Sequence, residues 1–171
     1  MQRRLIALAA LSAVLSGTSP ASAQEPVGCD KFKWDVTRER AALAQAGIPK
    51  LTSGSAMTGS LPQAVMLELT SPADAKLPSP PERNPKPDTF AGFTTVNIPA
   101  NGVYAIALSS SAWIDVMQNG SYLKSQTSSA VSGCDGLRKV VKFRITAGST
   151  TIQVSGVTES TIKIAVMPLT E

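Results

Sequence analysis

Trp113 and Asp115 are the two residues whose types and spacing point most directly to ligand binding. They stand two positions apart in an apolar run, so they lie on one face of a β-strand, whose side chains alternate between its two faces. An aromatic ring beside a carboxylate can hold a sugar, with the ring as a platform and the carboxylate as a polar anchor. The alternatives are that Trp113 packs against the body of the protein, and that Asp115 is solvated or pairs with a cross-strand lysine.

A second candidate is the positive side of the strand expected over 137–145. Arg138, Lys142 and Arg144 share one face of that strand, and Lys163 joins them if the last strand is its neighbour. Such a face would attract an anionic ligand or an acidic protein partner. The alternative is that these charges only protect an exposed sheet edge from pairing with another chain.

We expect these side chains to form one binding face. Its members are Trp113, Asp115, Arg138, Lys142 and Arg144, and Thr151, Gln153 and Ser155 can add uncharged hydrogen-bonding groups. The ligand expected there is a glycan or another anionic component of the cell envelope. Nucleic acid is not expected, because no aromatic residues are interleaved with the basic ones as the binding of a single strand requires.

The absence of histidine excludes most familiar catalytic and metal sites. A Ser-His-Asp or Cys-His nucleophile cannot be built, and two cysteines are too few for a cysteine-only zinc site. The sequence also lacks a phosphate-binding loop, a dinucleotide fingerprint and an EF-hand loop. We therefore expect no enzyme, no cofactor and no metal; the remaining catalytic alternative is a hydrolase that uses paired carboxylates or a Ser-Lys pair.

The first 23 residues predict a signal peptide. Arg3 and Arg4 precede an apolar run over 5–15, and Ala21-Ser22-Ala23 is a small-residue cleavage site. We expect cleavage after Ala23 and a periplasmic or secreted product. The alternative, a membrane anchor, is disfavoured because no apolar run approaches the ~20 residues that span a bilayer. The mature chain would keep 14 basic and 12 acidic residues, and its net charge of +2 does not by itself imply nucleic acid or an anionic membrane as a partner.

Cys29 and Cys134 are expected to form a disulfide. An even number of cysteines in an oxidising compartment predicts pairing. The two cysteines lie 105 positions apart in the sequence. Closing so long a loop removes about 4–5 kcal/mol of unfolded-state entropy in the chain-entropy model. The alternative is a pair of free thiols or a redox pair, although no C-x-x-C motif is present.

The region over 24–60 is expected to hold a helix and a loop that pack on the body. Asp35 is a suitable N-cap, Gly47 suits the position after the helix, and Pro49 prevents its continuation. The six prolines over 71–88 exclude a central strand. We interpret that segment as a crossover strapped over the surface, and a flexible linker is the alternative.

The rest of the chain, 61–171, predicts an all-β domain. Short alternating runs are separated by Gly, Asn and Ser turns, and they predict an antiparallel β-sandwich of jelly-roll type with one short N-terminal helix. Eight strands are expected, near 64–69, 93–98, 103–109, 112–117, 121–125, 137–145, 150–155 and 160–167.

The part over 96–167 resembles the bacterial pre-peptidase C-terminal type of jelly-roll domain. The likeness rests on a G-x-Y-x-I-x-L strand at Gly102–Leu108, an Asp-bearing apolar strand at Trp113–Met117, and a G-x-x-x-I-x-V strand at Gly148–Val154. The helix and the proline-rich segment depart from that family. The resemblance implies an accessory module that binds and does not react; the alternative is an interaction subunit that docks on another periplasmic protein.

Overall fold

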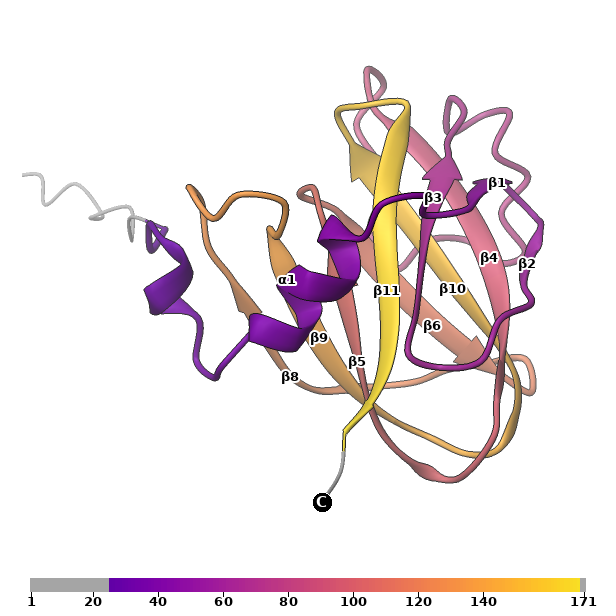
Figure 1. Ribbon diagram of the computed structural model, residues 1–171. Coiled ribbons are helices and arrows are strands. Elements are labelled where there is room, and N and C mark those ends of the chain that lie inside the picture. Colours follow the sequence, from indigo (N-terminus) through magenta and orange to yellow (C-terminus); the bar gives the residue numbers. More distant parts are fainter. Residues whose placement is uncertain (1–24, 170–171) are drawn as a thin grey trace, which may run out of the picture.

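Alternating apolar residues build two β-sheets that face each other (Figure 1). The structure is a computed structural model that describes residues 25–169. The signal peptide expected over 1–23 lies outside the described residues. The all-β sandwich with one short α-helix is confirmed, and no helix of the described part is long and apolar enough to cross a membrane.

One sheet has six strands and the other has five. The six-stranded sheet runs in the order β1 (Lys50–Thr52), β3 (Gln63–Glu68), β11 (Thr161–Leu169), β5 (Gly102–Leu108), β9 (Lys139–Ile145) and β8 (Ser125–Ala130). The five-stranded sheet runs in the order β2 (Ala56–Met57), β4 (Phe90–Ile98), β10 (Gly148–Val157), β6 (Trp113–Gln118) and β7 (Ser121–Tyr122). The pairs β1–β3 and β2–β4 are parallel. Both sheets are therefore mixed, where the sequence predicted purely antiparallel ones.

The main core lies between the sheets. Large aliphatic side chains from the inner faces fill it, among them Leu67, Ile106, Ile152 and Ile164. The polar side chain of Gln118 is also buried, at one end of this core. Its amide nitrogen donates to the carbonyl of Thr146 at 2.8 Å, and its amide oxygen accepts from the Thr146 hydroxyl at 2.5 Å. Because Thr146 lies in the turn that leaves β9 for β10, this side chain ties the two sheets together.

A second, smaller core lies on the outer face of the six-stranded sheet, under the N-terminal segment. The helix α1 (Thr37–Ala44) lies over this face, and the short 3-10 helix η1 (Cys29–Lys31) lies beside β8 at the edge of the sheet (Figure 1). The sheet presents small side chains there: Ala64, Ala105, Ala107 and Ala165. Because these residues project little above the backbone, Leu43 of α1 is almost completely buried against the second core.

The helix begins one residue later than predicted. Asp35 precedes its first turn and accepts hydrogen bonds from the backbone N–H and the hydroxyl of Thr37, at 2.9 and 2.7 Å. These bonds hold the pKa of Asp35 below its ordinary value of 3.8. The N-cap is therefore Val36, and the prediction of Asp35 as N-cap is wrong by one residue, although the Asp35 carboxylate accepts from the first N–H of the helix.

The predicted disulfide is present. Cys29 and Cys134 are bonded, with their Cα atoms 4.7 Å apart. The bond joins η1 to the loop between β8 and β9. Next to it, the backbone N–H of Gly28 donates to the carbonyl of Ser132 at 2.8 Å. The N-terminal segment is therefore fastened to the edge of the six-stranded sheet.

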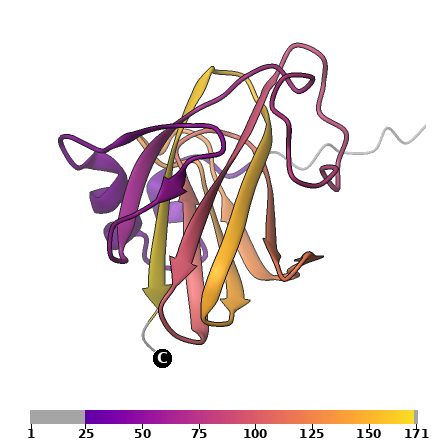
Figure 2. The ribbon, with the colours of Figure 1, turned by 90° about the vertical axis from the view of Figure 1, so that its right-hand side faces the viewer.

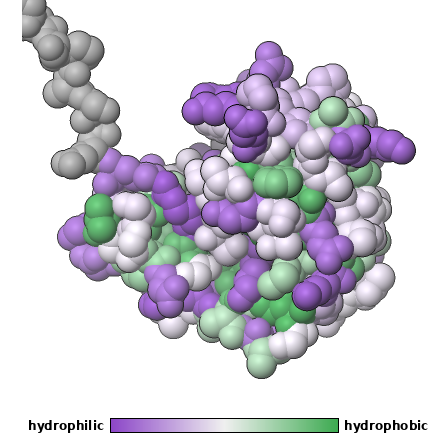
Figure 3. Space-filling model, turned by 90° about the horizontal axis from the view of Figure 1, so that it is seen from above, coloured by the Kyte–Doolittle hydropathy of each residue, from purple (hydrophilic) through white to green (hydrophobic). Residues whose placement is uncertain are grey.

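The proline-rich segment over 71–88, here called the strap, contains no strand and no helix. It connects β3 of one sheet to β4 of the other and projects at the upper right of Figure 2. Seen from above, the molecule shows small, separate apolar areas among hydrophilic residues (Figure 3). That end of the molecule thus offers polar groups more than a continuous apolar surface.

Candidate functional site

A cavity of about 550 Å³ opens beside the strap, where the margins of the two sheets meet. The strap, β6, the β7–β8 connection and β9 contribute its lining residues. Strand β7 is only two residues long and pairs with the far end of β6. Most of β6 is therefore left as an open edge, and we call this hollow the Trp113 cavity.

Two exposed aromatic side chains border this cavity. Trp113 is 41% exposed and Tyr122 is 38% exposed; apart from Val27 they are the large apolar residues that the described part leaves open to solvent. The guanidinium of Arg83 lies 3.7 Å from the centroid of the Trp113 ring, and the ammonium of Lys139 lies 5.2 Å from it. The Trp113 ring is thus partly buried, which agrees with the packing interpretation, and its exposed part lies beside two cations.

Three cations line the Trp113 cavity: Arg83, Lys124 and Lys139. The two ion pairs among the described residues, Lys31–Asp30 and Arg138–Glu25, include none of the three. No carboxylate of the described part lies within 4 Å of these three charges, although Glu82 and Asp115 also line the cavity. The cations exceed the carboxylates by one, so the cavity can take an anionic group.

The electrostatics of Lys139 agree with this view. Burial lowers its pKa below the ordinary value of 10.5, and the charges of Arg138 and Arg83 lower it further, against an opposing effect of Asp115. Its ammonium donates to the carbonyl of Ala112 at 3.0 Å. A negative group placed beside it would relieve the repulsion among these cations.

Asp115 is buried, so the expectation of a solvated side chain is wrong, and it does not pair with a lysine either. Its Oδ2 accepts from the backbone N–H of Glu82 at 3.3 Å and from the side-chain amide of Gln153 at 3.2 Å. Glu82 belongs to the strap. The hydroxyl of Tyr122 likewise donates to a strap carbonyl, that of Pro80. Asp115 therefore anchors the strap over the cavity.

The five residues predicted to form one face lie on both sheets. Trp113 and Asp115 lie on β6 of the five-stranded sheet, whereas Lys142 and Arg144 lie on β9 of the six-stranded sheet. The single face is therefore not formed. The prediction failed because side-chain alternation fixes which residues of one strand share a face, but not which strands share a sheet.

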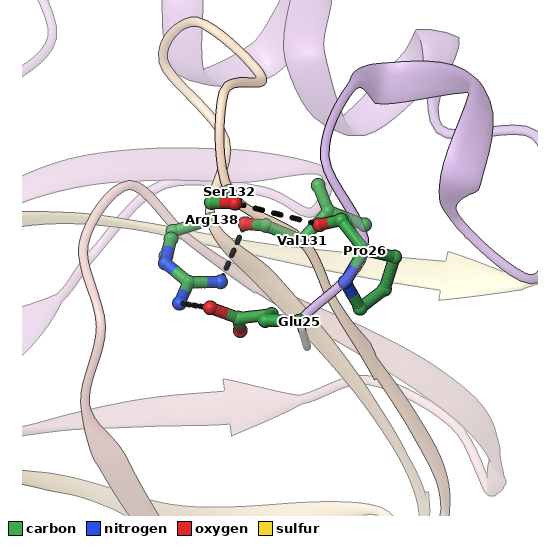
Figure 4. A network of polar contacts seen from close by, with 5 residues as sticks. All are labelled: Glu25, Pro26, Val131, Ser132 and Arg138. Carbon is green, nitrogen blue, oxygen red and sulfur yellow. Dashed lines mark hydrogen bonds and ion pairs between the residues drawn. The ribbon is translucent and has the colours of Figure 1, made fainter. Parts of the chain in front are cut away.

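Arg138 lies close to the Trp113 cavity but is already engaged. A neighbouring hollow of about 240 Å³ is lined by Arg138, Glu25, Trp113 and Lys139, among others. The guanidinium of Arg138 donates to the carboxylate of Glu25 and to the carbonyl of Val131, both at 2.5 Å (Figure 4). Arg138 therefore holds the N-terminal segment, and Figure 4 shows Pro26 and Ser132 joined beside it.

The positive face of β9 exists, but the N-terminal segment covers part of it. The ammonium of Lys142 lies 4.0 Å from the centroid of the Trp34 ring, and that of Lys163 donates to the Leu43 carbonyl at 3.0 Å. Arg144 is exposed and lines a separate hollow with Asn101. The sequence could not show this cover, because α1 and β9 lie about a hundred residues apart.

The idea that these charges protect an edge is also wrong. Strand β9 pairs with β5 on one side and with β8 on the other. The edge on this side is β8, and none of the eight expected strands covers 126–130, because this stretch has no large apolar residue and no alternation. The uncharged groups proposed for the basic face, Thr151, Gln153 and Ser155, lie in β10 beside β6 instead.

Four residues of the cavity were not predicted from the sequence: Arg83, Tyr122, Lys124 and Lys139. Lys139 carried one usable signal: it interrupts the apolar side of β9, where Val141 and Phe143 follow at two-residue spacing. Arg83 carried none, since it stands 30 positions from Trp113 within the strap. No group of three or more acidic, cysteine or histidine side chains in the described part could hold a metal ion.

No family model matches this sequence, and no curated protein matches it either. The resemblance to the pre-peptidase C-terminal type of domain stays a prediction.

Proposed function

We propose that this protein is a non-enzymatic binding or accessory module of the periplasm or the secreted space, and that it takes an acidic glycan or another anionic envelope component in the Trp113 cavity. The observation that carries the proposal is the set of three cations without a carboxylate partner around two exposed aromatic rings.

The aromatic rings and the cations have complementary tasks. The open part of the Trp113 and Tyr122 rings offers apolar surface to the C–H face of a sugar ring, and Arg83, Lys124 and Lys139 offer donors to a carboxylate, sulfate or phosphate. Because exposed charges are screened by salt, affinity should fall as ionic strength rises. The disulfide supports a location in an oxidising compartment.

The test is calorimetric titration with a panel of uronic-acid oligomers, sulfated sugars and phosphorylated sugars, and with neutral oligosaccharides of equal length. We expect binding of acidic saccharides that Lys139→Met and Trp113→Ala each weaken by about tenfold or more, the effect of losing one charged or stacking contact. Lys50→Met is the matched control, because Lys50 is exposed on β1, at the opposite edge of the six-stranded sheet. Absence of binding by every acidic saccharide would contradict the proposal.

A further inference from the structure

A patch of polar side chains lies on the outer face of the five-stranded sheet, under the strap. In the register of β10 with β6, Gln153 is opposite Asp115 and Ser155 is opposite Trp113. Two contacts place strap residues above this patch: the backbone N–H of Glu82 donates to Asp115, and the guanidinium of Arg83 lies over the Trp113 ring. The patch is therefore continuous with the Trp113 cavity, which Asp115 and Trp113 also line.

The patch has hydrogen-bonding capacity that the protein does not use. Gln153 is 0% exposed and Ser155 is 1% exposed, yet the amide oxygen of Gln153 and the hydroxyl of Ser155 have no hydrogen-bond partner. Buried polar groups are nearly always bonded, since an unpaired one loses its bonds to water without replacement. Both hydrogen bonds of Asp115 also fall on Oδ2, and both are long, at 3.2 and 3.3 Å.

The strap is held over this patch by few polar contacts. Three are seen: the Glu82–Asp115 bond, the Arg83–Trp113 stack and the Tyr122–Pro80 bond. Each involves a side chain of β6 or β7 that also lines the Trp113 cavity. A ligand in the cavity therefore competes for the same side chains that hold the strap down.

We propose that the binding site has a second, uncharged half under the strap. When the strap lifts, ligand hydroxyl groups bond to Asp115, Gln153 and Ser155, while the acidic group stays with Lys124 and Lys139. The ligand is then an acidic saccharide that needs both its hydroxyls and its charge. This inference rests on the proposed function, which requires only the charged half.

Two probes separate the halves. Trigalacturonic acid carries hydroxyls and carboxylates, and tricarballylate carries three carboxylates without a hydroxyl. We expect Ser155→Ala to weaken binding of trigalacturonic acid by about tenfold, the effect of one lost hydrogen bond, and to leave tricarballylate binding unchanged. Ser149→Ala is the matched control, since Ser149 lies on the same face of β10 but is exposed.

The strap supplies an independent readout. In hydrogen exchange, the Glu82 amide should exchange faster when trigalacturonic acid is bound, because its bond to Asp115 is broken, and should not respond to tricarballylate. If the wild-type protein binds neither probe and no other acidic saccharide, the proposed function fails. If it binds both, and Ser155→Ala or the Glu82 amide does not distinguish them, only the uncharged half is refuted.

Discussion

The guanidinium of Arg83 stacks on the indole ring of Trp113, 3.7 Å from its centroid, although the two residues are 30 positions apart. The contact joins the strap to the open edge of β6. Cation–π contacts at exposed sites contribute about 0.5–1 kcal/mol, so this one holds the strap without locking it.

Removing the Trp113 ring should release the strap. In Trp113→Ala we expect trypsin to cut faster after Arg83, because the guanidinium loses its stacking partner and the segment opens more often. The far-ultraviolet circular dichroism should stay unchanged, since the ring is 41% exposed and contributes little to the core. Timed proteolysis with mass spectrometry checks this; cutting after Arg83 at the wild-type rate would show that the stack does not hold the strap.

Asp115→Ala should destabilise the protein by about 1–3 kcal/mol. The substitution leaves the amide of Gln153 buried without an acceptor, which carries the desolvation cost of an unpaired polar group. Asp115→Asn keeps an oxygen at the same place and should cost less. Urea denaturation of both variants measures the difference, and equal losses would mean that the Gln153 bond has no energetic role.

Lys139 should make stability depend on alkaline pH. Its pKa is lower in the folded protein than the ordinary value of 10.5 in the unfolded chain, mainly through burial. Between these two values the unfolded state binds more protons, so this residue makes the free energy of unfolding rise with pH through that window.

The measurement for Lys139 is the difference between the wild type and Lys139→Met, which removes the titration of this residue and keeps most of its length. The free energy of unfolding of the wild type should rise relative to that of the variant as pH increases toward 10.5. Parallel curves over that range would show that the ammonium is not desolvated.

Gln118→Ala should cost about 2 kcal/mol or more. The variant removes the bonds to Thr146 and leaves the fully buried hydroxyl of Thr150 without its contact to the Gln118 amide at 3.2 Å. Because Gln118 connects β6 to the turn between β9 and β10, unfolding should also become faster. Stopped-flow unfolding in urea measures this, with Gln126→Ala on the exposed part of β8 as the matched control.

Replacing both cysteines by serine should lower the free energy of unfolding by about 2–5 kcal/mol, the usual loss for a native disulfide. Binding in the Trp113 cavity should persist, because none of its lining residues belongs to η1 or α1. Intact mass after alkylation without reductant checks the bond itself. Two labelled thiols in the native protein would contradict it.

The sequence predicted strands well where alternation was strong. The apolar side of β9, with Val141, Phe143 and Ile145, and the hairpin signal at Asn119-Gly120 both mark real elements. Strand β8 was not predicted, because its serine and threonine residues show no alternation of apolar and polar side chains. Strands β1 and β2 were not predicted either, because they are two or three residues long and depend on their partners for pairing.

The candidate site was only half visible in the sequence. Trp113 and Asp115 share a face as alternation requires, and this part could be predicted. The cations that face them come from the strap, the β7–β8 connection and the inward side of β9, so they depend on how the sheets stack. No local pattern encodes that stacking.

The fastening of the N-terminal segment has a consequence for the order of assembly. Cys29 is made 105 residues before its partner, and the alanine face under α1 is complete only when β11, the last strand, has been added. During synthesis the N-terminal segment therefore has no complete sheet face against which α1 can pack. We expect it to close over a sandwich that has already formed, so Cys29 should pair with Cys134 only after β11 has been synthesised.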